Sequence, residues 1–293
     1  MKEIVVISGK GGTGKTSIVA SFAVLSQNAV IADCDVDAAD LYLVLNPEVQ
    51  ITEPFSGGKI AEIIPERCTN CGECEQVCRF DAISEKVDGG TTNYTIDPVS
   101  CEGCGVCVAV CPAKAISFEP HENGELFVSS TKYGPMVHAK LGIAEDNSGK
   151  LVSLVRARAK VIAEDNGRDL IIVDGPPGVG CPVISSITGA HAVLIVTEPT
   201  VSGVHDLERV MKLTTHFNIP TYVCINKHDI NPEVTQNIED RAKSLNITVL
   251  GKIHYDPVIT KAQIHAVPIV EYCQNKVSQE ITTLWTSLYK CIL

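Results

Sequence analysis

The chain has 293 residues, 45% of them hydrophobic and 5% aromatic, which is enough apolar content for one large domain or two smaller ones. No run approaches the ~20 apolar residues of a membrane-spanning helix. The formal net charge of −11 argues against broad nucleic-acid binding, which needs a basic face. The 13 cysteines are odd in number and clustered, which favours metal binding in a reducing, cytoplasmic compartment over a disulfide framework.

The first predicted elements are a strand over residues 4–7, a glycine-rich loop and a helix over 16–25. Residues 8–16 read Ser-Gly-Lys-Gly-Gly-Thr-Gly-Lys-Thr and match the phosphate-binding pattern G-x-x-x-x-G-K-[ST]. Glycines let backbone N–H groups turn toward a polyphosphate, and the helix N-terminus adds partial positive charge. We therefore expect Lys15 to reach the β- and γ-phosphates and the Thr16 hydroxyl to bind Mg²⁺.

A second lysine in this loop, Lys10, makes the motif resemble that of the deviant Walker A ATPases, the MinD/ParA/Mrp group. The resemblance implies that Lys10 contacts the nucleotide of a facing subunit, and hence a homodimer with ATP at its interface. It also implies catalytic roles for Lys10, Lys15 and Asp35. The nucleotide-binding residues of the loop are then Gly9, Lys10, Gly11, Gly12, Thr13, Gly14, Lys15, Thr16 and Ser17.

A second strand, predicted over residues 29–35, ends in Asp33-Cys34-Asp35. The resembled family also ends a strand here with Asp-x-Asp. By that resemblance Asp35 orients the attacking water and Asp33 lies nearer Mg²⁺. Carboxylates beside a γ-phosphate need the metal to offset their charge. A plain acidic strand end is the alternative interpretation.

One cysteine spacing, Cys-x2-Cys-x2-Cys-x3-Cys, begins at Cys68 and again at Cys101. This is the spacing of two-cluster ferredoxins, in which the fourth cysteine ligates the other cluster. Zinc is the competing metal, although two Cys₄ zinc sites do not require the x3 offset. The predicted [4Fe–4S] ligand sets are Cys68, Cys71, Cys74 and Cys111 for one cluster, and Cys78, Cys101, Cys104 and Cys107 for the other.

These cysteines predict a small α+β domain like bacterial ferredoxins over residues 65–120. It would be inserted into a P-loop ATPase domain made of residues 1–64 and 121–293. The acidic character of residues 68–120 suits docking to a basic redox partner. Of the residues that follow, 132–149 are expected to form a mobile loop and 150–164 a helix.

The second half alternates predicted strands with helices. Strands are expected over 169–174, 192–197, 221–226 and 247–253, and helices over 204–217, 232–245, 257–265 and 277–291. The pattern is typical of a mostly parallel, doubly wound α/β sheet. At the C-terminus an apolar stripe with one basic neighbour, Lys290, favours packing on the sheet over membrane binding. The stripe comprises Ile281, Leu284, Trp285, Leu288 and Ile292.

Three further sites depend on the resemblance. Asp174, followed by Gly-Pro-Pro-Gly, resembles a Walker B segment and would hold Mg²⁺ through water. Asn226 would read the base, with Asp256 and Pro257 near the adenine. Residues 226–229 also spell the N-K-x-D of GTPases, so the choice of ATP depends on the family. Cys181 is either a small switch residue or a transient cluster contact.

Together these features predict an ATP-binding and ATP-hydrolysing iron–sulfur protein. Its nucleotide-dependent dimer switch would be coupled to electron transfer through two [4Fe–4S] clusters, with ATP and Mg²⁺ as further cofactors. The expected partner is a redox or cofactor-assembly protein; neither nucleic acid nor stable membrane insertion is expected. Two alternatives stay open: an ATP-dependent carrier or maturation factor for metal cofactors, and a positioning ATPase like MinD or ParA.

Overall fold

The computed structural model describes residues 1–88, 90–142 and 148–292, and the chain forms two compact units. The first, here called the sheet unit, contains Met1–Glu53, Leu126–Lys140 and the chain from Ser148 onward. The second, the cysteine unit, contains Pro54–Glu125 and the described residues 141–142. The insertion predicted over 65–120 lies inside the cysteine unit, which extends further at both ends.

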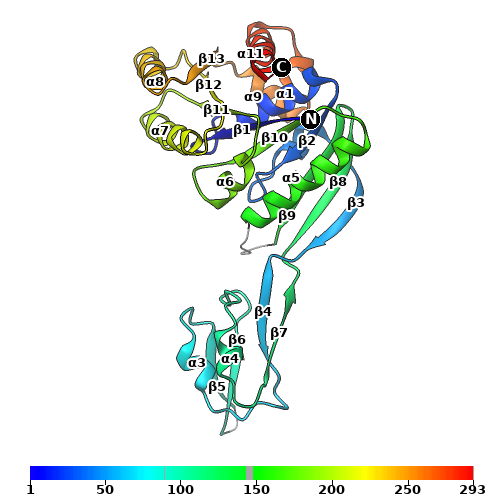
Figure 1. Cartoon of the computed structure of the whole chain (residues 1–293), viewed down its shortest axis with the longest axis vertical. Helices are drawn as coiled ribbons and strands as arrows, with labels where there is room; N and C mark the ends of the chain where they lie inside the picture. The colour runs from blue at the N-terminus through cyan, green and yellow to red at the C-terminus, as the bar shows by residue number, and fades with distance from the viewer. Residues whose placement is uncertain (89, 143–147, 293) are drawn as a thin grey trace. The chain divides into compact units, whose positions relative to one another are not determined.

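The sheet unit is built on a nine-stranded sheet in the order β13-β12-β11-β1-β10-β2-β9-β8-β3 (Figure 1). Every neighbouring pair from β13 to β9 is parallel. The central strands are continuous apolar runs because both of their faces are buried. The predicted α/β fold with a mostly parallel sheet is therefore confirmed. The strands are β1 (Lys2–Ser8), β2 (Ala29–Asp33), β3 (Glu48–Phe55), β8 (Gly124–Thr131), β9 (Gly134–Leu141), β10 (Leu170–Pro177), β11 (Ala192–Thr197), β12 (Thr221–Asn226) and β13 (Thr248–Ile253).

Helices cover both faces of this sheet (Figure 1). On one face α1 and α11 share a core, in which the rings of Phe22 and Trp285 lie 5.0 Å apart between centroids. The five apolar residues of the predicted C-terminal stripe are all buried there, so their packing on the sheet is confirmed. The helices of this unit are α1 (Lys15–Ser26), α2 (Leu41–Leu45), α5 (Ser148–Asp165), α6 (Cys181–Ile187), α7 (Val201–His216), α8 (Pro232–Ser244), α9 (Val258–Ile264), α10 (Ile269–Tyr272) and α11 (Lys276–Ile292).

The loop expected over residues 132–149 is wrong for its first half. Residues 134–141 form β9, which lies beside β2 with Met136 opposite Ile31 and Val137 opposite Ala32. Met136 and Val137 are fully buried. The short apolar run is interrupted by His138 and Lys140, so its strand character comes from the neighbouring strands that cover it. Residues 143–147 of the predicted loop lie outside the described residues.

The cysteine unit contains two antiparallel strand pairs, β4 with β7 and β5 with β6. Its small core packs Ala61, Ile83 and Ile116 around Cys74 and Cys107. No helix in the described parts of either unit is long and apolar enough to cross a membrane. The elements of this unit are β4 (Gly58–Ile63), α3 (Glu73–Val77), β5 (Ile83–Asp88), β6 (Thr91–Ile96), α4 (Val106–Val110) and β7 (Ile116–His121).

Candidate functional site

The phosphate-binding loop lies where β1 ends at Ser8 and α1 begins at Lys15. Gly12 and Gly14 have φ angles of 78° and 89°, in the left-handed region that favours glycine. At Gly9 an added Cβ would lie 2.5 Å from the Cβ of Asp206 on α7. The loop therefore needs its glycines for two reasons, backbone conformation and close packing against a neighbouring helix.

Lys15 is buried among carboxylates at the edge of the sheet. Its Nζ donates to Asp174 Oδ1 at 2.7 Å and to Asp35 Oδ2 at 3.2 Å. Burial alone would lower the pKa of Lys15, but these carboxylates outweigh it and raise the pKa above its usual value. Burial raises the pKa of Asp35, and Lys15 opposes that shift. Lys15 is thus the counter-charge of an acidic cluster contributed by β2 and β10.

Asp33, the third carboxylate of this cluster, is almost fully buried at the end of β2. Burial, followed by the charge of Asp174, raises the pKa of Asp33 well above its usual value. The Oδ2 atoms of Asp33 and Asp174 and the Thr13 Oγ1 are buried without a hydrogen-bond partner in the described part of the chain. Buried oxygens without partners are costly, and carboxylate oxygen is the ligand that Mg²⁺ prefers. The two unpartnered carboxylate oxygens therefore suit a Mg²⁺ ion, which takes one or two protein carboxylates and keeps several waters.

An opening of about 640 Å³ lies over the loop. Most of the predicted nucleotide-binding residues line it: residues 11–17, Asn226 and Asp256. Gly9, Lys10 and Pro257 do not line it, and Pro257 instead stands at the N-terminus of α9. The opening is large enough for a nucleotide, and the loop of β1 and α1 forms its floor.

Lys10 points away from this opening and is held by the turn after β11. Its Nζ lies 2.7 Å from Glu198 Oε1 and donates to Thr200 Oγ1 at 3.0 Å and Ser202 Oγ at 2.9 Å. Glu198 also binds Lys227 at 2.9 Å. Burial would raise the pKa of Glu198, but the two lysines outweigh it and lower the pKa. In this structure Lys10 is therefore committed to its own subunit.

Asn226 ties the end of β12 to the phosphate-binding loop. Its Nδ2 donates to the Thr13 carbonyl at 2.7 Å, and its Oδ1 accepts from the Lys227 N–H at 3.0 Å. Asn226 is buried, with 4% of its surface exposed. Its structural role is to hold the loop, and base reading by Asn226 stays a prediction.

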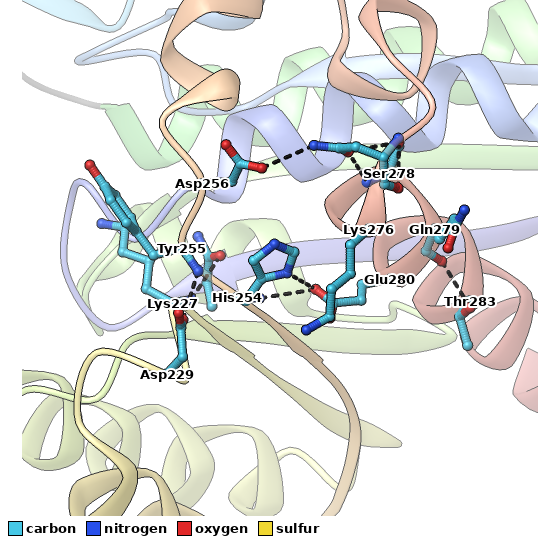
Figure 2. Close-up of polar contacts among 12 residues, drawn as sticks. Lys227, Asp229, His254, Tyr255, Asp256, Lys276, Ser278, Gln279, Glu280 and Thr283 are labelled. Carbon is cyan, nitrogen blue, oxygen red and sulfur yellow. Dashed lines mark hydrogen bonds and ion pairs between the residues drawn. The ribbon is translucent and has the colours of Figure 1, made fainter.

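The segment between β13 and α9 forms another wall of the opening, and it is held from several sides (Figure 2). The Tyr255 N–H donates to Asp229 Oδ1 at 2.7 Å, and the His254 N–H donates to Glu280 Oε2 on α11 at 3.0 Å. Asp256 Oδ2 accepts from Asn275 at 3.0 Å. One carboxylate oxygen of Asp229, the last residue of the N-K-x-D sequence, thus accepts a backbone hydrogen bond from this segment.

Several residues of this site were missed by the sequence analysis. Glu198, Thr200 and Ser202 hold Lys10 from 188 to 192 positions away in the sequence, and no local pattern predicts such a contact. Tyr255 and Gln263 line the opening, and Gln263 donates to the Ser17 hydroxyl at 2.9 Å. Their positions near the predicted Asp256 are the one signal that could have found them.

The eight clustered cysteines line two cavities of the cysteine unit, four in each. Cys78, Cys101, Cys104 and Cys107 line one, here called the α4 cavity. Cys68, Cys71, Cys74 and Cys111 line the other, the α3 cavity. Each cavity thus combines three cysteines of one repeat with the fourth of the other. No group of three or more His, Cys, Asp or Glu side chains in the described residues is placed to hold a metal ion. Cys181 is exposed at the first position of α6.

Comparison with known proteins places the nucleotide site in a family. The sequence model of the CobQ/CobB/MinD/ParA nucleotide binding domain matches residues 4–269. An uncharacterized protein of Methanocaldococcus jannaschii is 34% identical over 99% of this chain and 97% of its own length. The septum site-determining protein MinD of Bacillus subtilis is 22% identical over 94% of this chain and 84% of its length. MinD of Pyrococcus horikoshii, solved in complex with Mg-ADP, superposes with a TM-score of 0.59 at 18% identity, covering 99% of this chain and 96% of that one.

Proposed function

Because this chain belongs to the CobQ/CobB/MinD/ParA nucleotide-binding family, we propose that it binds Mg²⁺ and ATP at the opening over the phosphate-binding loop and hydrolyses the ATP. The observation that carries the proposal is the buried cluster of Lys15, Asp35, Asp174 and Asp33 at the floor of that opening. It supplies one positive charge for phosphate, on Lys15, and unpartnered carboxylate oxygens for a metal.

Each residue of the cluster then has its own task. Lys15 exchanges its carboxylate partners for phosphate oxygens, while Thr16, Asp33 and Asp174 hold Mg²⁺, which neutralises phosphate charge when bound. Asp35, half-buried and within 3.2 Å of Lys15, orients the water that attacks the γ-phosphate. The backbone N–H groups of residues 11–14 bind phosphate at the start of α1.

We further propose that ATP joins two copies of the chain. Lys10 would leave Glu198 and contact the nucleotide of the facing subunit. The support is the loop sequence and the fact that Lys10 does not line its own subunit's opening. The test compares Lys15→Ala and Lys10→Ala, with Lys290→Ala on α11 as a control. Lys15→Ala should lose ATP binding. Lys10→Ala should bind ATP yet lose ATP-dependent dimerisation and hydrolysis. Normal dimerisation and hydrolysis by Lys10→Ala would overturn the sandwich dimer.

For the cysteine unit we propose two [4Fe–4S] clusters, one in each cysteine-lined cavity. The support is the repeated cysteine spacing, together with the finding that each cavity is lined by four cysteines, three from one repeat and one from the other. The family match and the relatives described above do not bear on this proposal. Anaerobic purification followed by iron, sulfide and zinc analysis and EPR spectroscopy tests it. Stoichiometric zinc without sulfide would overturn it.

If both proposals hold, the chain is an ATPase that gates electron transfer, and the partner is a redox protein. The comparisons favour a second candidate more directly, a positioning ATPase, because one relative with a named role is a septum site-determining protein. A carrier of metal cofactors is the third. One set of assays separates them: electron-transfer rates with and without ATP, transfer of iron to an apo-protein, and ATP-dependent distribution of the tagged chain in cells. Rates that ATP leaves unchanged, with a patterned distribution, would replace the redox proposal by the positioning one.

A further inference from the structure

The two cysteine-lined cavities are built from equivalent positions of one repeat. Cys101 follows Cys68 by 33 residues, and the same offset relates the other residues that line the two cavities, except for Val77 and Gly103. The α4 cavity is lined by Ala82, Ile83 and Ile96. The α3 cavity is lined by their counterparts, which are Ala115, Ile116 and Ile63. The apolar walls of the cavities are therefore matched almost residue for residue.

Four matched positions differ in chemistry: Thr69 is matched by Glu102, Glu73 by Val106, Ala113 by Phe80 and Tyr94 by Ala61. Both glutamates are exposed charges, and the pair that contains Tyr94 differs by an aromatic hydroxyl group. Tyr94 on β6 lines the α3 cavity, and its counterpart on β4, 33 residues earlier, is Ala61, which lines the α4 cavity. The space beside Ala61 is filled from the neighbouring strand, because Phe118 lies directly opposite Ala61 in the β4–β7 pair. The α3 cavity thus has the Tyr94 ring in its wall, whereas the α4 cavity has Phe80 in its wall and Phe118 close by. Neither phenylalanine carries a hydroxyl group.

The rings of Tyr94 and Phe118 lie against equivalent glycines, one in each cysteine repeat. Gly72 and Gly105 stand between the second and third cysteines of each repeat, with φ angles of 74° and 73°, and begin the short helices α3 and α4. The Tyr94 hydroxyl oxygen lies 2.7 Å from where a Cβ of Gly72 would stand. Two ring carbons of Phe118 lie 3.2 Å from the same point at Gly105. The Tyr94 hydroxyl therefore lies beside the Cys71–Cys74 segment.

A hydroxyl next to cluster sulfur stabilises the more negative, reduced form, so it raises the reduction potential. We propose that Tyr94 makes the two sites unequal by raising the potential of the cluster held by Cys68, Cys71, Cys74 and Cys111. This inference rests on the proposed function of the cysteine unit. Its consequence is that a single electron stays at the α3 cavity, while the α4 cavity, which no hydroxyl-bearing residue lines in the described chain, holds the more strongly reducing cluster.

Exposed charges near the Tyr94 and Phe118 rings shift the two reduction potentials in the opposite direction to the Tyr94 hydroxyl. Glu85 lies across from Tyr94 in the β5–β6 pair, and the Lys59 Nζ lies 5.3 Å from the centre of the Phe118 ring. Both residues are exposed, so salt screens them, with a Debye length of about 3 Å at 1 M. The hydroxyl contribution is short-range and does not depend on salt. Measuring the two potentials at high salt therefore isolates it.

The experiment compares the wild-type chain with Tyr94→Phe and Phe118→Tyr by redox titration at high salt, with EPR resolving the two clusters. Tyr94→Phe should lower the higher potential and leave the lower one in place. Phe118→Tyr should raise the lower one, so both variants narrow the gap. Iron and sulfide content is measured on each sample first.

Two clusters in Tyr94→Phe with both potentials unmoved would overturn the inference and leave the proposed function standing. A wild-type chain that takes up no iron and sulfide would overturn both. If Tyr94→Phe fails to fold, Phe118→Tyr decides alone, because it adds the hydroxyl and keeps the ring. Failure of Phe118→Tyr to shift the lower potential would then count against the proposal.

Discussion

The nucleotide site and the cysteine-lined cavities hold their reactive groups in opposite ways. In the nucleotide site the charges are paired within the chain, with Lys15 between Asp174 and Asp35, and Lys10 on Glu198. Around the cavities the thiols have weak partners, such as the 3.4 Å contact from Cys68 Sγ to Asn70 Oδ1. Burial also raises the pKa of the Cys74 and Cys107 thiols, which disfavours the thiolate.

The difference concerns where the counter-charge comes from. In the sheet unit the counter-charges are side chains of the same chain, so a bound ligand must displace them. Removing one of these side chains leaves a buried charge without its counter-charge. If the cysteine unit binds the proposed clusters, their metal would supply the positive charge that its thiolates need, and its stability would depend on that binding. Variants that alter one counter-charge at a time test this comparison.

The largest effect is expected when Lys15 is removed. Lys15→Met leaves Asp33, Asp35 and Asp174 close together without their cation. Unfolding free energy should fall by about 3–5 kcal/mol, the usual loss when one partner of a buried ion pair is deleted, and ATP hydrolysis should be lost. Mg²⁺ should restore stability to the variant more than it stabilises the wild type. Thermal unfolding with and without Mg²⁺ measures this; a variant as stable as the wild type without Mg²⁺ would break the comparison.

In the cysteine unit the corresponding test removes one cysteine that would ligate a cluster. Cys78→Ala should damage the cluster held by Cys101, Cys104 and Cys107 and leave the other cluster largely intact, so roughly half of the iron is lost, since each [4Fe–4S] takes four cysteines. Cys291→Ala, an exposed cysteine on α11, is the control and should keep all of it. Iron analysis and EPR report the result. Loss of the Cys68 cluster instead would contradict the shared ligand sets.

His138 is a buried titratable group whose hydrogen-bond partner, the Ser129 hydroxyl, is neutral. Its Nε2 lies 2.9 Å from the Ser129 hydroxyl, and burial lowers the pKa of His138 from 6.5 to about 4. Between these two pH values the unfolded chain binds a proton at His138 that the folded chain does not. The contribution of neutral His138 to the free energy of unfolding is therefore complete above about pH 6.5 and is lost as the pH falls toward 4. The loss reaches about 3 kcal/mol. Chemical denaturation of His138→Phe should show a flatter dependence over this range, whereas His205→Gln, which alters an exposed histidine, should match the wild type.

The sequence predicted the local motifs but not the contacts between residues that are far apart in the chain. The phosphate-binding loop and both cysteine repeats could be predicted because their chemistry needs fixed residues at short spacing. The central strands followed from continuous apolar runs. β9 was missed because His138 and Lys140 interrupt its apolar pattern, and its burial comes from β2 and β8. The holding of Lys10 by Glu198 could not be predicted, because it joins two loops that only the folded sheet brings together.

The smallest effect tests that last contact. Glu198 holds Lys10 at 2.7 Å in a partly exposed pair, with Thr200 and Ser202 completing the set. If Lys10 acts on the facing subunit, this set competes with the dimer. Glu198→Gln keeps the shape and weakens the hold by up to about 1 kcal/mol, the upper end for exposed pairs. Because the dimer contains two such contacts, its ATP-dependent dissociation constant should fall by up to about thirtyfold, measured by analytical ultracentrifugation. Because Glu198 also binds Lys227, the matched variant is Ser202→Ala, which loosens Lys10 alone and should shift dimerisation in the same direction by less. Weaker dimerisation in both variants would mean that Glu198 and Ser202 support the dimer, and Lys10 would then be poised by this contact and not restrained by it.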